Sequence, residues 1–132
     1  MSESSRDLAR QAAWVALAEL FVARELQAYD YRAIADALLR ARLPVDELRQ
    51  ILRTEVGPAF IANLSPLNSV PSFEGWHREY VLERVAATRS SASALWGRMR
   101  LLASPNPLKN RIVAARWKEV EALLSAGSAS GA

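Results

Sequence analysis

Apolar residues recur at the spacing of an α-helix along nearly the whole chain, and this periodicity limits the possible folds more than any other feature. Trp14, Leu17 and Phe21, for example, follow the i, i+3, i+7 pattern of one buried helix face. No stretch alternates apolar and polar residues between hairpin turns, as paired strands would. A chain of 132 residues is long enough for one core and short for two. The sequence therefore predicts an all-α fold, a single compact domain of five or six short helices in an orthogonal or bundle-like array.

Capping residues, prolines and apolar spacing place the individual helices. The first is capped by Ser4, Ser5 or Asp7 and ends near Leu26. The others are predicted over residues 30–42, 44–56, 76–88, 95–102 and 107–124, with a further turn at 59–62 beyond a break or kink at Gly57-Pro58. Pro44 suits a first helical position, because its missing N–H would have no partner there. The inward faces are predicted to carry Ile34, Leu38, Leu48, Ile51, Leu52, Val56, Val113, Trp117, Val120 and Leu124, with Tyr31 as a further candidate. Trp76 and Tyr80 mark the helix at 76–88.

The domain is predicted to span residues 1–124, because residues 125–132 are small and polar and read as a disordered tail. Residues 63–75 contain two prolines, two asparagines and three serines, and they are predicted as one long irregular connection. The first residues lack the apolar run of a signal peptide. No stretch approaches the roughly 20 apolar residues of a membrane helix. We therefore expect a cytoplasmic protein with no membrane span.

The side chains needed for most catalytic chemistry are scarce. The chain has no cysteine and one histidine, His77, which excludes disulfides, thiolate metal sites, cysteine nucleophiles and sites built from several histidines. No phosphate-binding loop, dinucleotide-binding, nucleophile-elbow or zinc-protease motif occurs. We interpret His77 as a surface or capping residue, with a general base as the alternative. The chain is predicted to have no catalytic residues, no metal site and no cofactor.

Three glutamates offer the one arrangement that favours an enzyme or a metal binder. Glu19, Glu25 and Glu55 would approach one another if the first and third helices pack together. A carboxylate pair in a cleft can act as acid and base or hold a divalent cation. The competing interpretation, which we prefer, is that these glutamates bind Arg24, Arg53 or backbone N–H groups.

Positive charge gathers in the second half of the chain. Residues 1–60 hold eight basic and nine acidic side chains, and residues 61–132 hold nine basic and five acidic, so the formal net charge of +3 comes from the second half. No acidic residue lies between Glu83 and Glu119. The residues predicted to bind a partner are Trp96, Arg98, Arg100, Arg111, Arg116 and Lys118. The alternative is that these cations are solvated or paired with carboxylates of the first half.

A basic surface on a scaffold without catalytic equipment favours a non-catalytic protein-binding module. The most concrete form is an immunity-type inhibitor of a bacterial toxin or effector, which would present an acidic face to these cations. The alternative is a small basic nucleic-acid-binding protein that uses the same arginines on phosphates. A carboxylate-dependent enzyme or metal binder is the third hypothesis.

Four stretches combine into a longer motif: residues 14–26 (WVALAELFVAREL), 30–35 (DYRAIA), 48–58 (LRQILRTEVGP) and 63–64 (NL). Together they resemble a family of short bacterial proteins of unknown function, with the pattern W-x-A-L-S-x-L-F-x-x-x-E-L, I-A-x-x-L, L-x-x-I-L-x-x-E-V-x-P and N-L. The matches that are not simply helix-core positions are Glu25, Glu55, Pro58 and Asn63. Ala18 departs from the pattern, where serine is expected, and no match continues beyond about residue 80. The resemblance implies a helical fold and no particular activity.

Overall fold

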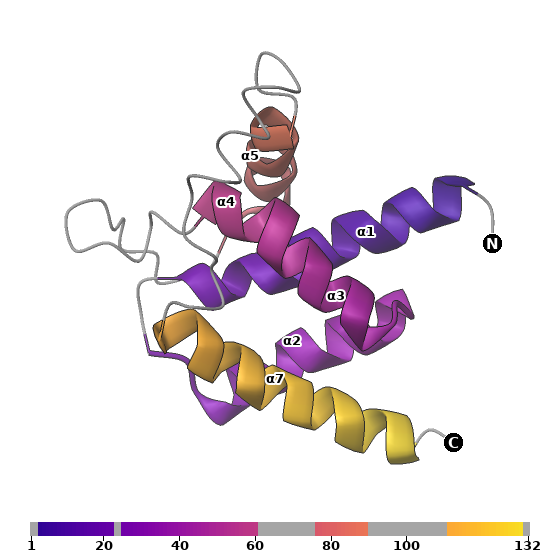
Figure 1. Cartoon of the computed structure of the whole chain (residues 1–132), viewed down its shortest axis with the longest axis vertical. Helices are drawn as coiled ribbons and strands as arrows, with labels where there is room; N and C mark the ends of the chain where they lie inside the picture. The colour runs from indigo at the N-terminus through magenta and orange to yellow at the C-terminus, as the bar shows by residue number, and fades with distance from the viewer. Residues whose placement is uncertain (1–2, 23–24, 61–75, 90–110, 131–132) are drawn as a thin grey trace.

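The computed structural model describes residues 3–22, 25–60, 76–89 and 111–130 (Figure 1). Its elements are α1 (Glu3–Ala18), the 3₁₀ turn η1 (Glu19–Phe21), α2 (Ala28–Ala41), α3 (Val45–Ile51), the π-helical segment η2 (Leu52–Val56), α4 (Gly57–Phe60), α5 (Arg78–Arg89) and α7 (Arg111–Ser130). These ranges contain no strand, so the predicted all-α fold is confirmed. None of their helices has the length and apolar character needed to cross a bilayer.

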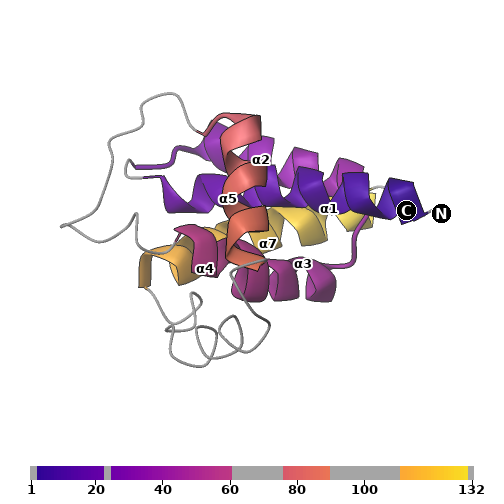
Figure 2. The same ribbon diagram turned by 90° about the horizontal axis from the view of Figure 1, so that it is seen from above.

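The helices pack around α1, which contacts α2, η2 and α5. Helix α7 lies along α2 on the side away from α5 and also contacts η1 (Figure 1). Seen from above, α5 crosses α1 at a steep angle (Figure 2). The largest fully buried side chains come from every one of these layers, and include Leu17, Phe21, Leu48, Phe60, Val81 and Leu124. One continuous core therefore holds the described part of the chain together.

The predicted inward faces are confirmed. Trp14, Leu17 and Phe21 are buried, as are the residues predicted to face inward from the second, third and last helices, except that Tyr31 is half-buried. Of the aromatic residues that mark the helix predicted at 76–88, Trp76 is half-buried and Tyr80 is 43% exposed. The agreement follows from geometry, because side chains three or four positions apart in a helix share one face and meet the core together.

The first predicted helix ends earlier than expected. Instead of continuing to Leu26, α1 tightens into η1 at Glu19, and Val22 is already extended. Leu20, Phe21 and Val22 are consecutive and all fully buried. A continuous helix would point three consecutive side chains in different directions, so the change of backbone conformation lets all of them enter the core.

The third predicted helix does not stop at Gly57-Pro58 but widens before it. The N–H of Gly57 donates to the carbonyl of Leu52, five residues back, which is the π-helical pattern. Pro58 has no N–H to donate, so the backbone just before it cannot keep the regular α ladder. The chain then continues through α4, which includes the first two residues of the turn predicted at 59–62; the other two lie outside the described residues. Pro44 occupies the N-cap of α3, one position before the predicted one.

The last helix is longer than predicted. Helix α7 continues to Ser130, into the segment predicted as a disordered tail. At Gly127 this helix lies close to α2, since a Cβ there would come within 2.6 Å of Leu39 Cδ1, the end of a side chain that can shift. The predicted connection at 63–75 and the predicted helix at 95–102 lie outside the described residues.

Candidate functional site

Glu55 is buried inside the fold and is held by two residues of α1. Its side chain lies in η2, and the residue is only 6% exposed. Its Oε1 accepts hydrogen bonds from Arg10 Nε at 2.9 Å and from Trp14 Nε1 at 2.7 Å. Its Oε2 accepts a second bond from the Arg10 guanidinium, at Nη2. Both carboxylate oxygens are therefore engaged, and Glu55 joins η2 to α1.

The pairing with Glu55 shifts the pKa of Arg10. The hydrogen bond with Glu55 raises the pKa of Arg10 above its ordinary value, although partial burial acts in the opposite direction. The guanidinium is charged under all ordinary conditions, so Arg10 acts as a fixed counter-charge. Arg10 of the first helix is thus the counter-charge of Glu55, whereas Arg53, one of the partners that the sequence offered for the three glutamates, is exposed.

The other two predicted glutamates do not join Glu55 in one pocket. Glu19 lines a different space, between α1 and α2, and its Oε1 accepts a hydrogen bond from the backbone N–H of Trp76 at 3.2 Å. Glu25 is exposed. Among the described residues no group of three or more His, Asp or Glu side chains is placed to hold a metal ion. His77 is exposed, and its carbonyl accepts the N–H of Val81 at the start of α5.

Trp76 attaches the start of α5 to the end of α1. Its indole Nε1 donates to the carbonyl of Ala18 at 2.9 Å. Its ring stacks on Tyr80 and packs against Phe60, with centroids 5.6 and 5.1 Å apart. The indole therefore supplies both a hydrogen bond and an aromatic contact.

Trp76→Phe should lower the free energy of unfolding by about 1–2 kcal/mol, because it removes this hydrogen bond and leaves the Ala18 carbonyl without it. Tyr80→Phe is the matched control. In the wild-type chain the Tyr80 hydroxyl accepts only a 3.3 Å hydrogen bond from Arg84 at an exposed position. Its removal should therefore change the free energy of unfolding by no more than about 0.5 kcal/mol. Urea denaturation measures both. Equal losses in the two variants would contradict the role given to the indole N–H.

The residues predicted to bind a partner differ in how far they are exposed to solvent. Arg111 and Lys118 are exposed on α7. Arg116 is half-buried, and its Nη1 donates to the carbonyls of Leu20 and Val22, both at 2.9 Å. Arg116 therefore fastens α7 to the end of α1. Trp96, Arg98 and Arg100 lie outside the described residues.

Arg116 also affects the pKa of the nearby Tyr31 side chain. Burial raises the pKa of Tyr31, and the positive charge of Arg116 opposes this increase. Arg116 thus has internal partners on η1 and an electrostatic effect on α2. Its guanidinium donates hydrogen bonds to groups of this chain, whereas the guanidinium groups of an arginine-rich binding surface would donate to a partner.

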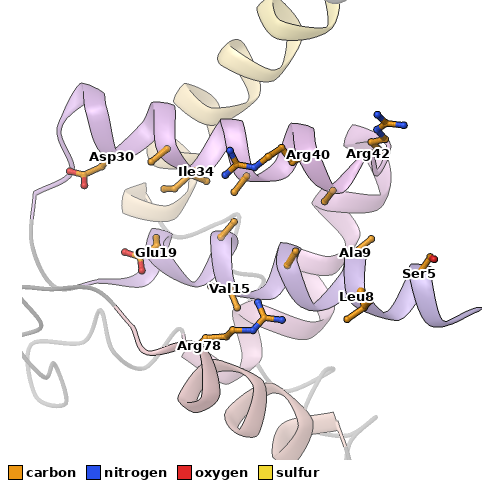
Figure 3. A pocket seen from close by; sticks show the side chains of 15 residues that line it. Ser5, Leu8, Ala9, Val15, Glu19, Asp30, Ile34, Arg40, Arg42 and Arg78 are labelled. Carbon is orange, nitrogen blue, oxygen red and sulfur yellow. The ribbon is translucent and has the colours of Figure 1, made fainter.

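A groove lies between α1 and α2, which run antiparallel (Figure 3). We call it the α1–α2 groove. Its volume is about 670 Å³. The lining residues are Ser5, Leu8, Ala9, Ala12, Val15, Ala16 and Glu19 from α1, Asp30, Ala33, Ile34, Ala37, Arg40 and Ala41 from α2, Arg42 just after α2, and Arg78 at the start of α5. Most of this lining is apolar, and Leu8 at its edge is 61% exposed.

Charged side chains border the α1–α2 groove. Glu19 and Asp30 lie at one end, and Asp30 Oδ2 accepts the backbone N–H of Gln27 in the capping box of α2 (Figure 3). On the α2 side Arg40 reaches toward the middle of the groove and Arg42 lies at the other end, and Arg78 lies beside α1 (Figure 3).

Sequence reasoning missed this groove, although a signal was present. Alanines recur at positions 9, 12 and 16 and again at 33, 37 and 41, which places them on one face of each helix. Small side chains on facing helices leave a space when no third element fills it, and that condition depends on the tertiary arrangement.

The comparisons with known proteins show which family the described groove falls within. A protein-family model matches residues 8–123, and this range includes all of the groove lining except Ser5. The match extends well past residue 80, where the resemblance seen in the sequence ended. No curated protein matches, and no solved structure matches.

Proposed function

We propose that this chain, which belongs to the family described as a domain of unknown function (DUF7079), is a non-catalytic module that binds another protein through the α1–α2 groove. The finer form of the proposal is an immunity-type inhibitor whose partner is a bacterial toxin or effector with an acidic face. The observation that carries the proposal is the groove itself, an apolar depression bordered by arginines. Contiguous apolar surface rimmed by polar residues is typical of protein interaction sites.

The groove replaces α7 as the preferred interface. The sequence favoured the cations of the last helices, but Arg116 is engaged with the carbonyls of Leu20 and Val22. Arg40, Arg42 and Arg78 are exposed instead. Arginine beside apolar side chains is a frequent combination at the energetically important centre of an interface.

A photo-crosslinking experiment tests this proposal. Benzoylphenylalanine replaces Ala33, an exposed residue of the groove, or Arg53, an exposed residue outside it. The chain is expressed together with the products of neighbouring genes and irradiated. We expect a covalent adduct of defined mass from position 33 and none from position 53, with the partner identified by mass spectrometry. The purified partner should then bind the wild-type chain.

Ala37→Trp supplies the second measurement. Ala37 is half-buried in the groove lining, so an indole there fills the space that the partner needs. We expect binding of the captured protein to weaken at least about tenfold in calorimetric titration, with the helical circular dichroism retained. Equal crosslinking from positions 33 and 53, or unchanged binding by a folded Ala37→Trp variant, would contradict the proposal.

Nucleic-acid binding is the second candidate function, and the exposure of Arg111 and Lys118 on α7 supports it. Binding to phosphates releases counterions, so its affinity falls steeply as salt rises. Fluorescence titration with labelled DNA and RNA at low and at moderate salt distinguishes the two candidates. Absence of binding at low salt eliminates the nucleic-acid function.

A further inference from the structure

The shape of the α1–α2 groove matches a third helix. From Leu8 to Glu19 the lining follows α1 for about 16 Å at 1.5 Å per residue, which is about three helical turns. The floor carries the methyl groups of Ala12, Ala16 and Ala37. Because helix axes approach according to the side chains between them, such a floor allows a close third helix.

The charges around the groove select the occupant. Arg40 reaches from α2 toward the middle of the groove, and Arg78 lies on the opposite side, beside α1 (Figure 3). Neither they nor Arg42 form an ion pair with another described residue. Glu19 and Asp30 at the far end each accept a backbone N–H. The negative charge therefore lies at one end of the groove, and an occupant of the remaining length meets the positive charge of Arg40 and Arg78 on its two sides (Figure 3).

We propose that the α1–α2 groove binds one amphipathic α-helix of the partner, with aliphatic side chains on its inner face and carboxylates along both flanks. This inference rests on the proposed function and specifies its partner. The aliphatic face covers Leu8 and Val15, and the carboxylates meet Arg40 on one side and Arg78 on the other. Binding of an amphipathic helix by an apolar groove is a recurrent mode of recognition.

Other anionic occupants fit these features less well. A fatty acid has one carboxylate and would satisfy one arginine, whereas the arginines lie on two sides of the groove. A single-stranded nucleic acid needs aromatic faces for base stacking, and the groove lining contains no aromatic residue. A helix with several spaced carboxylates satisfies both the apolar floor and the separated cations.

Three stapled 18-residue peptides test the inference. The first is helical and amphipathic, with Leu and Ala on one face and Glu on both flanks. The second replaces each Glu by Lys. The third has the composition of the first in an order that removes the apolar face. We expect the first peptide to bind the wild-type chain at least about tenfold more tightly than the other two in fluorescence anisotropy. Its advantage over the Lys peptide should shrink as salt rises, because that difference is electrostatic.

Charge reversal supplies the matched variants. In Arg40→Glu/Arg78→Glu the preference should invert, so that the Lys peptide binds more tightly than the Glu peptide. Arg53→Glu, at an exposed position outside the groove, should leave the order unchanged. Circular dichroism verifies that each variant is folded.

The outcomes separate this inference from the proposed function. Equal binding of the Glu and Lys peptides by the wild-type chain overturns the proposed charge recognition. Equal binding of the first and the reordered peptide overturns the proposal that the occupant is an amphipathic helix. Crosslinking from position 33 without binding of any peptide also overturns the inference, but it leaves the proposed function standing. If position 33 captures no protein and no peptide binds, both fall.

Discussion

Arg10→Met should lower the free energy of unfolding by about 2–3 kcal/mol. The substitution keeps an extended side chain but removes the counter-charge of Glu55, which would remain inside the fold with Trp14 as its remaining side-chain donor among those described above. Removal of one partner from a buried pair is costly because the other charge loses its compensation. The Arg10 side chain is 40% exposed, so water can reach the vacated space, and we place the loss at the lower end of that class.

Two comparisons distinguish the cost of leaving the Glu55 carboxylate buried without Arg10 from the cost of losing the packing contacts of Arg10. Arg10→Met/Glu55→Leu removes both charges and should recover much of the lost stability. The deficit of Arg10→Met relative to the wild type should also shrink as pH falls, because burial without a counter-charge favours the protonated carboxyl and folding then takes up a proton. Urea denaturation at neutral and mildly acidic pH measures both effects. A deficit that is the same at both pH values and persists in the double variant would contradict the role of Glu55.

Arg116→Met should lower the free energy of unfolding by about 2 kcal/mol. The wild-type guanidinium donates to the carbonyls of Leu20 and Val22 at the point where α1 has ended and the chain turns toward α2. Hydrogen bonds from a charged donor are stronger than neutral ones, and the Leu20 carbonyl also lies in the last turn before the chain becomes extended, at the negative end of the helix dipole. The loss should therefore exceed that of an ordinary surface arginine.

The matched controls are Arg111→Met and Lys118→Met, which remove exposed cations from the same helix. Each should change the free energy of unfolding by less than about 0.5 kcal/mol. Arg116→Met should also raise the pKa of Tyr31 further, because Arg116 lowers it in the wild-type chain. Spectrophotometric titration of the phenols measures this change. A similar decrease in the free energy of unfolding in all three variants would contradict the role of Arg116 in joining α7 to the end of α1.

These predictions concern residue pairs that local sequence reasoning cannot identify. Arg10 and Glu55 are 45 positions apart, and Arg116 and Leu20 are 96 apart. The sequence singled out Glu55 as a family-like position that was not simply helix core, and it favoured internal binding of this carboxylate but did not identify Arg10 as the partner. It assigned Arg116 to a binding surface. The partners of each side chain come from helices whose relative placement no local pattern encodes.

The α1–α2 groove illustrates the same limit. Both of its walls were predicted as helices, and the alanines that form its floor were visible in each. The depression exists because α1 and α2 run side by side with small residues facing each other and with α7 on the other face of α2. The arginines that border it come from α2, from the residue after it and from the start of α5, which only folding brings together.

By itself the sequence determined the helical class, the approximate helix positions and the inward-facing residues, because these depend on periodicity and capping within a few consecutive turns. It also excluded every chemistry that needs cysteine or several histidines. Only the tertiary structure decided which charges are neutralised internally, where α1 ends, how far α7 extends and that a groove stays open. Those outcomes depend on contacts between residues that are distant along the chain, and burial, desolvation and steric fit act on such contacts only after the helices have packed.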